Sequence, residues 1–293
     1  MNPQPQCGQV ARLRSITDEG RMMRPIPILM YHGIDTQATP AFRRWVVSPT
    51  LFDEHMGWLA QHGYRVLTVA GLEAAMREGR PLPERTVVIT FDDGFRDFLN
   101  AVPILERYGF PATLYVTTGY VGGTSSWLRG LGEGGRPMLS WDEVRAVAAA
   151  GIECGGHTQS HPQLDIIPAA RAFQEIQGSK HELEDQLGAQ VVSFAYPFGY
   201  SSATTRRLVE QAGYRIACRG RNALSSRDEH RFALSRITIT PATRPDDLGP
   251  LLSGERLEVA PPLESLFRQG WRAARWVTQF TGGYAMLVSA VPV

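Results

Sequence analysis

Short runs of apolar residues recur along this chain, separated by longer segments in which apolar residues return every three or four positions. The runs expected to form strands cover residues 26–31, 64–67, 87–91, 112–117, 152–154, 191–196, 214–218 and 237–240. Several are apolar at consecutive positions, as Val87-Val88-Ile89 is, which is typical of strands buried on both faces. Strands that alternate with helices predict an α/β fold built on a parallel sheet or barrel.

The intervening segments carry helix signals. Helical periodicity covers residues 69–78, 95–108, 169–187 and 204–212. Ser48-Pro49 predicts the start of another helix, because serine caps the amino terminus and proline fits the first turn. Ser140 and Glu143 have the spacing of a capping box and predict one more helix start.

Polar residues follow four of the predicted strands. They are His32, the pair Asp92-Asp93, His157 and the turn Tyr196-Pro197-Phe198. In a parallel α/β fold the carboxyl ends of the strands share one face, where active sites are built. Two adjacent carboxylates at the end of a buried strand are costly for stability, which favours a functional role. The alternative is a solvated turn in which an aspartate caps the next helix.

His157 and His161 lie four residues apart in the segment His-Thr-Gln-Ser-His-Pro. Pro162 disfavours a helical backbone at His161, so the pair is expected on a loop. Thr158 stands where a helical zinc-protease motif needs glutamate. Two histidines and one aspartate would leave open positions on a metal ion, as in catalytic sites. Zinc is the first expectation and other divalent transition metals remain open. The alternative is two unrelated surface histidines.

The remaining carboxylate would then lie beside the metal without binding it. A metal lowers the pKa of bound water, and a nearby base can remove the proton. The other histidines fall in predicted helices or a charged loop and are expected at the surface; they are His55, His62, His181 and His230.

Residues 90–94 (TFDDG) and 157–162 (HTQSHP) resemble the first two motifs of the polysaccharide deacetylases, carbohydrate esterase family four. Residues 195–199 (AYPFG) are similar to the third motif. The resemblance covers about residues 28–240. It implies a distorted (β/α) TIM-like barrel and a divalent metal that serves to hydrolyse N- or O-acetyl groups on sugars.

The resemblance also implies a role for each matching residue. Asp92 would be the catalytic base, and Asp93, His157 and His161 the metal ligands. The backbone N–H of Phe198 would help to bind the oxyanion. The expected metal is Zn²⁺, with Ni²⁺, Co²⁺ and Fe²⁺ as alternatives.

The chain departs from the family pattern in two places. Ala195 stands where the third motif commonly has an arginine that orients the base, and Arg236 on a neighbouring strand is a candidate replacement. The late leucine-rich motif with the acid histidine is missing, but residues 28–32 (ILMYH) look like that motif moved to the front. The same permuted order occurs in the branch resembling poly-N-acetylglucosamine deacetylases, which implies that His32 is the general acid. The alternative is that His32 packs against the barrel rim.

Three aromatic residues are candidates for stacking on a sugar, although each could equally belong to the core. Trp127 lies in the glycine-rich segment 119–137, whose length predicts a functional or disordered loop. Trp45 and Tyr196 are the other two.

The domain organisation predicted is a polar amino-terminal extension over 1–25, a catalytic domain over 26–240, and a linker with an amphipathic helix over 241–293. That basic helix could contact a membrane surface, or it could dock on its own domain.

The 30 basic and 29 acidic residues nearly cancel, so a nucleic-acid partner is not expected. Three widely spaced cysteines argue against a disulfide framework. With no secretion signal or membrane span recognised, the cytoplasm is the expected location.

The function predicted is that of a metal-dependent hydrolase that removes N-acetyl or O-acetyl groups from a sugar or polysaccharide, with an acetylated glycan as its partner. One alternative is a deformylase or deacetylase of a lipid-linked or small glycan precursor. A rival of another class is an inactive carbohydrate-binding module.

Overall fold

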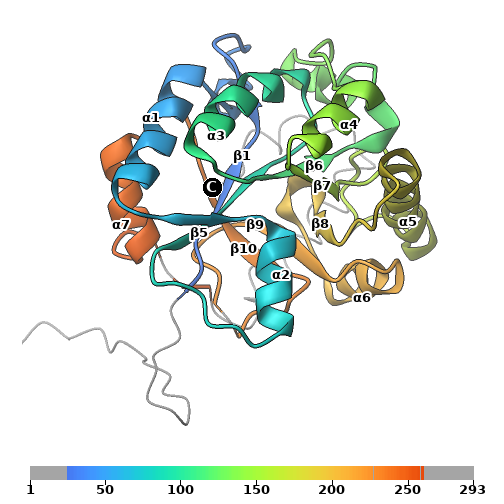
Figure 1. Cartoon of the computed structure of the whole chain (residues 1–293). Helices are drawn as coiled ribbons and strands as arrows, with labels where there is room; N and C mark the ends of the chain where they lie inside the picture. The colour runs from blue at the N-terminus through green and yellow to red at the C-terminus, as the bar shows by residue number, and fades with distance from the viewer. Residues whose placement is uncertain (1–24, 227, 258, 261–293) are drawn as a thin grey trace, which may run out of the picture.

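The computed structural model describes residues 25–226, 228–257 and 259–260, and its centre is a closed ring of seven parallel strands (Figure 1). In order around the ring they are β1 (Ile28–Tyr31), β10 (Leu234–Thr238), β9 (Ile216–Asn222), β8 (Ser193–Ala195), β7 (Glu153–Gly156), β6 (Thr113–Val116) and β5 (Thr86–Phe91). Pairing of β1 with β5 closes the ring. A further strand, β4 (Arg65–Leu67), pairs with the first half of β5. The predicted TIM-like barrel is confirmed.

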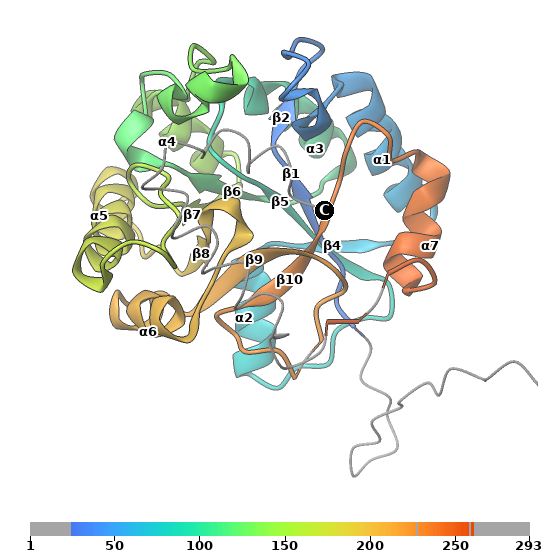
Figure 2. The ribbon, with the colours of Figure 1, turned by 180° about the vertical axis from the view of Figure 1, so that it is seen from behind.

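Helices surround the ring on its outside (Figures 1 and 2). They are α1 (Pro49–Gln61), α2 (Val69–Arg77), α3 (Val102–Tyr108), α4 (Trp141–Ala149), α5 (Ala169–Leu187), α6 (Ala203–Gln211) and α7 (Leu248–Ser253). Ser48 caps α1 by accepting a hydrogen bond from the Leu51 amide, and Ser140 and Glu143 form the predicted capping box of α4. The helix starts that were expected from these signals are confirmed.

Two predicted segments differ from the structure. The helix expected over 95–108 is wrong, because a short 3₁₀ helix, η2 (Arg96–Asn100), precedes α3. Pro103 lacks an N–H and fits the first turn of a new helix better than the middle of a long one. The glycine-rich segment is ordered and contains η3 (Thr118–Tyr120) and η4 (Ser126–Leu131). The remaining short elements are β2 (Gly33–Ile34), η1 (Arg43–Trp45), β3 (Val46–Val47), η5 (Pro197–Gly199) and η6 (Pro245–Asp247).

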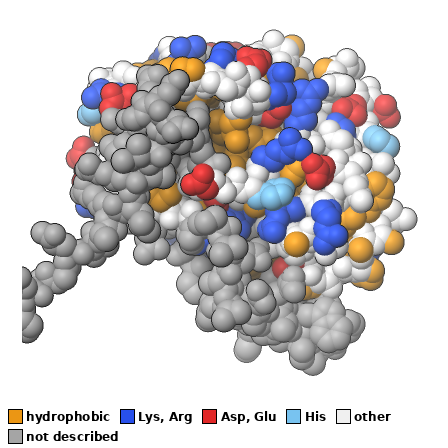
Figure 3. Space-filling view, turned by 90° about the horizontal axis from the view of Figure 1, so that it is seen from below, with side chains coloured by type: hydrophobic (Ala, Val, Ile, Leu, Met, Phe, Trp, Pro, Cys, Tyr) orange, Lys and Arg blue, Asp and Glu red, His pale blue; other side chains and the backbone are white. Residues whose placement is uncertain are grey.

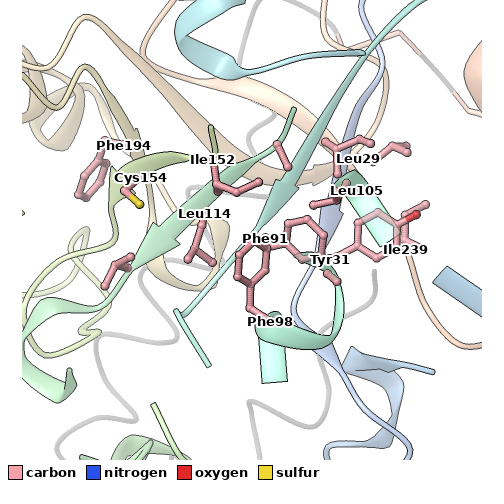
Figure 4. Close-up of a cluster of buried hydrophobic side chains, with 14 of the residues drawn as sticks. Leu29, Tyr31, Phe91, Phe98, Leu105, Leu114, Ile152, Cys154, Phe194 and Ile239 are labelled. Carbon is pink, nitrogen blue, oxygen red and sulfur yellow. The ribbon is translucent and has the colours of Figure 1, made fainter. Parts of the chain in front are cut away.

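Aromatic rings lock β1 and β5 together near their carboxyl ends (Figure 4). Tyr31 stacks on Phe91 with ring centroids 5.3 Å apart, and Phe98 meets Phe91 edge to face at 4.8 Å. Tyr31 and Phe91 are also opposite each other in the strand register. Because the two strands end at the same level, the residues that follow them, His32 and Asp92, leave the barrel side by side.

The chain beyond the last barrel strand continues along the barrel's outside. α7 lies beside α1 (Figure 2), and its Leu248 and Leu252 are buried in the same apolar cluster as residues of α1. The extension predicted over 1–25, apart from Pro25, and the amphipathic helix predicted near the carboxyl terminus lie outside the described residues. Within those residues, no helix combines the length and the apolar character needed to cross a membrane. Basic and acidic side chains are interspersed over the described part of the face seen in Figure 3.

His55 was expected at the surface, and this expectation is wrong. The side chain points from α1 toward the barrel and is fully buried. Its Nε2 lies 2.9 Å from the Thr243 carbonyl oxygen, and its Nδ1 lies 3.1 Å from the Tyr31 hydroxyl. Since a carbonyl only accepts, Nε2 carries the proton and Nδ1 accepts from Tyr31. His62, His181 and His230 are exposed as predicted.

Replacing His55 by alanine should lower the free energy of unfolding by about 2–4 kcal/mol, because it leaves a cavity and two buried polar groups without partners. Urea unfolding measures the change. His181→Ala, at an exposed position, is the control and should change stability by less than about 0.5 kcal/mol. Equal effects of the two substitutions would contradict the assigned hydrogen bonds.

Candidate metal centre and catalytic pair

Three side chains predicted as metal ligands converge at the carboxyl end of the barrel. Asp93 follows β5, His157 follows β7, and His161 lies further along the same loop as His157. Oδ1 of Asp93 is 3.4 Å from Nε2 of His157 and 3.1 Å from Nε2 of His161. All three residues are buried, and their ligand atoms lie within 4.8 Å of one another. The histidines are therefore not unrelated surface residues.

The hydrogen bond of His157 calls for a positive charge at this point. Its Nδ1 lies 2.8 Å from the Ala195 carbonyl oxygen, so Nδ1 carries a proton. In the neutral imidazole Nε2 then presents a lone pair toward the Asp93 carboxylate. Two lone pairs facing each other repel, so either a second proton or a cation must lie between them.

The geometry of the three donors suits a divalent metal. Two ligands at about 2.0–2.1 Å from a tetrahedral zinc ion lie roughly 3.3 Å apart, close to the observed separations. The Nδ1–H bond to Ala195 fixes the ring of His157 with Nε2 directed at the site, as metal-binding histidines require. Burial raises the pKa of Asp93, but the two histidines outweigh it and hold that pKa well below its ordinary value. Burial is the main reason that the pKa of His161 is lowered. The expected state is an ionised Asp93 carboxylate beside a neutral His161 imidazole.

Backbone strain is concentrated around the same residues. In the part of the chain that the structure describes, four non-glycine residues have a left-handed backbone. They are Asp93 (φ 79°), Thr158 (φ 66°), His161 (φ 57°) and Phe198 (φ 58°). Such conformations cost on the order of 1–3 kcal/mol each and persist where the surrounding structure enforces them. Their clustering indicates that the fold tolerates an unfavourable backbone free energy in order to place the side chains of the site.

Asp92 has a different partner from its neighbour. Arg236 of β10 grips both carboxylate oxygens, with Nη1 2.6 Å from Oδ1 and Nη2 2.7 Å from Oδ2. The arginine is fully buried, and its Nη1 and Nε also donate to the Thr90 hydroxyl and the Arg219 carbonyl. Burial raises the pKa of Asp92, but the guanidinium more than offsets it and the net pKa is lowered. Arg236, the candidate replacement for the arginine that the third motif commonly has at the position of Ala195, therefore contacts Asp92 directly.

His32 lies at the edge of the same site. Its ring contacts Trp45 at a centroid distance of 4.8 Å, and its Nδ1 is buried without a hydrogen-bond partner. Burial lowers the pKa of His32, and the charges of Asp93 and Asp92 oppose this shift. The imidazole therefore lies close enough to both carboxylates to be affected by their charges.

Aromatic side chains form the rest of the surroundings. The Phe198 ring meets His161 edge to face at 4.8 Å, and Trp127 stacks on His161 at 5.0 Å. Trp45 and Trp127 are both partly exposed. Tyr196 is fully buried and donates to the Phe232 carbonyl, so it belongs to the core and the expectation that it could stack on a sugar is wrong.

Sequence reasoning missed Arg136, which joins the loops around the site. Its guanidinium donates to Asp97 at 2.7 Å and to Glu133 at 3.2 Å, and it lies over the ring of Phe95. Phe95 in turn stacks against Trp127. No local pattern marks this residue, since Asp97 is 39 positions away. Arg136 therefore holds the glycine-rich segment, and with it Trp127, beside the metal-binding residues.

Replacing Arg236 by methionine should lower the free energy of unfolding by about 3–5 kcal/mol at about pH 8, because Asp92 would stay ionised and buried without its partner. The loss should shrink toward about pH 5, since an unpaired buried carboxylate has a raised pKa and takes up a proton as the pH falls. Urea unfolding at both pH values measures these effects. The double variant Asp92→Asn, Arg236→Met is the control and should recover most of the loss; a double variant as unstable as the single one would contradict the pairing.

Comparisons with known proteins agree with this geometry. Residues 79–217 match the family model described as polysaccharide deacetylase. A Bacillus subtilis (strain 168) protein, YxkH, whose name refers to polysaccharide deacetylases, is 28% identical over 217 residues, covering 74% of this chain and 72% of that protein. The poly-beta-1,6-N-acetyl-D-glucosamine N-deacetylase of Escherichia coli (strain K12) is 30% identical over 135 residues, covering 44% of this chain and 20% of that longer protein.

The fold matches solved deacetylases as well. The Streptococcus pyogenes deacetylase PplD, solved in complex with acetate, superposes with a TM-score of 0.69 at 28% identity. The match covers 79% of this chain and 99% of that one. Residues 79–217 thus form a polysaccharide deacetylase domain, and this domain holds both aspartates and both histidines at the barrel mouth.

Proposed function

We propose that this chain is a zinc-dependent deacetylase that hydrolyses N-acetyl groups on an N-acetylglucosamine-containing glycan. The observation that carries the proposal is the unequal environment of two adjacent aspartates. Asp93 lies against His157 and His161, whereas Asp92 is held by two hydrogen bonds from Arg236 and is not one of the three grouped ligand residues. One acid is thereby suited to binding a metal, and the other to acting beside it.

Asp93, His157 and His161 would hold the metal. When bound, a zinc ion supplies Lewis acidity and lowers the pKa of a coordinated water. An intact set of three ligands argues against an inactive carbohydrate-binding module, which has no use for buried metal ligands in strained backbone.

Asp92 would accept the proton of the attacking water as the general base. Arg236 keeps Asp92 ionised and fixes the plane of its carboxylate, so that the base is available without rearrangement. The backbone N–H of Phe198, next to His161, would stabilise the oxyanion of the tetrahedral intermediate.

His32 would donate a proton to the departing amine. An amine is a poor leaving group until it is protonated, and His32 follows β1 beside Asp92 at the edge of the site. Burial lowers its pKa, which makes the imidazolium a readier proton donor once it forms. Trp45 beside His32 and Trp127 beside His161 offer partly exposed rings on which a sugar could stack.

Acetate release from a panel of acetylated glycans tests the proposal, with poly-N-acetylglucosamine oligomers, O-acetylated sugars and N-formylated sugars compared directly. We expect acetate from the N-acetylated oligomers, loss of activity after chelation, and recovery with Zn²⁺. Formate release in preference to acetate would instead support a deformylase. No release from any member by the zinc-loaded protein would contradict the proposal.

The two aspartates should respond differently to the same substitution. Asp92→Asn should keep the zinc ion but lower kcat by at least about 10²-fold, because the base is lost. Asp93→Asn should lose both zinc and turnover, because a neutral amide is a much weaker ligand. Zinc content by atomic absorption, alongside acetate release, separates the two effects. Equal zinc loss in both variants would show that the roles are divided wrongly.

A further inference from the structure

We propose that Glu175 of α5 is a positioning residue that shapes the loop between His157 and His161 and so sets the affinity of the site for its metal. The inference rests on the proposed metal-binding role of these histidines. Glu175 lies on a helix outside the barrel and belongs to none of the motifs identified in the sequence.

The carboxylate of Glu175 binds the two residues that precede His161. Its Oε2 accepts hydrogen bonds from the backbone amides of Gln159 at 3.1 Å and Ser160 at 2.8 Å. Its Oε1 accepts a hydrogen bond from the Ser160 hydroxyl. The residue is only 8% exposed, so these donors replace most of the water that a free carboxylate would have.

The Glu175 carboxylate accepts hydrogen bonds from backbone amides that the left-handed residues of the loop leave without helix or sheet partners. Thr158 and His161, on either side of Gln159 and Ser160, both have left-handed backbone. A left-handed residue turns successive N–H groups to the same side, which makes a concave site for an anion. Hydrogen bonds from neutral donors to a charged acceptor are roughly twice as strong as those between neutral groups. Glu175 supplies that anion from within the protein, and thereby stabilises the strained turn that brings His161 back toward Asp93.

The opposite side of the loop is held by neutral backbone contacts. The amides of Thr118 and Gly119 donate to the carbonyls of Thr158 and Gln159 at 3.1 and 2.9 Å. A Cβ atom at Gly119 would lie 2.6 Å from the Gln159 oxygen, so the approach is as close as glycine permits. The loop is therefore held between η3 and α5, and on the α5 side Glu175 is the charged contact to its backbone.

Glu182 provides a matched control on the same helix. Its Oε1 accepts a hydrogen bond from the Gln159 side-chain amide at 2.6 Å, so it touches the same loop without binding its backbone. If backbone geometry is what matters, Glu175→Gln and Glu182→Gln should differ greatly, although both remove one negative charge from the same face of α5.

Zinc affinity, measured by competition with a chromogenic chelator, is the primary test. Glu175→Gln places an NH₂ group or a neutral oxygen against the loop donors, and zinc should bind about 10- to 100-fold more weakly. Glu182→Gln should stay within about twofold of the unaltered protein, as expected of a contact that leaves the ligands in place. The visible absorption spectrum of the Co²⁺-loaded protein reports ligand geometry, and it should change in Glu175→Gln alone.

The outcomes separate this inference from the proposed function. If the unaltered protein binds no zinc, the proposed function fails. If it binds zinc and Glu175→Gln matches it in both affinity and Co²⁺ spectrum, the positioning role alone is overturned. Should Glu175→Gln fail to fold by circular dichroism, Ser160→Ala decides, because it removes a single donor to Glu175. Its zinc affinity should fall between about twofold and tenfold, and an unchanged value would overturn the inference.

Discussion

The structure depends on keeping two adjacent carboxylates buried and ionised at the end of one strand. Each would be expelled from the interior or protonated if it stood alone. Arg236 compensates Asp92 with two short hydrogen bonds, and the two histidines lower the pKa of Asp93. The two carboxylates are stabilised by different elements, Asp92 by Arg236 of β10 and Asp93 by histidines of the loop after β7. The barrel thus separates two chemically identical residues into distinct environments.

The different environments of the two aspartates depend on contacts made elsewhere in the fold. The aromatic contacts of Tyr31, Phe91 and Phe98 fix where β1 and β5 end, and the clamp on the loop between the histidines maintains its left-handed residues. Strain of this kind is tolerated because the elements around it are well packed. Well-packed strands and helices therefore support the strained residues at the barrel mouth, as α5 supports the loop between the histidines.

The sequence predicted the barrel and the gathering of polar residues at its carboxyl end, because buried parallel strands and capping residues leave local patterns. It also pointed to Arg236 through the alanine at position 195. It missed Arg136 and misplaced His55, since each has a partner that is distant in sequence: Asp97 is 39 positions from Arg136, and Thr243 is 188 positions from His55. Tyr196 was ambiguous because a buried tyrosine and a sugar-stacking one look alike before the packing is known. Contacts between distant loops carry no periodic signal, and most of the site's supporting shell consists of such contacts.

The order of strands around the ring has a bearing on how the protein is made. Among the described strands β1 comes first in the chain, yet its two neighbours are β5 and β10, and β10 is the last of the described strands. Contacts so distant in sequence slow folding, because the intervening chain must be ordered first. Arg236 itself lies in β10, so a nascent chain that has not yet emerged as far as this strand holds Asp92 without its counter-charge. Nearly the whole barrel must therefore be synthesised before Asp92 can be buried together with Arg236. The closing of the ring by β10 and the completion of the site then occur in the same late step of folding.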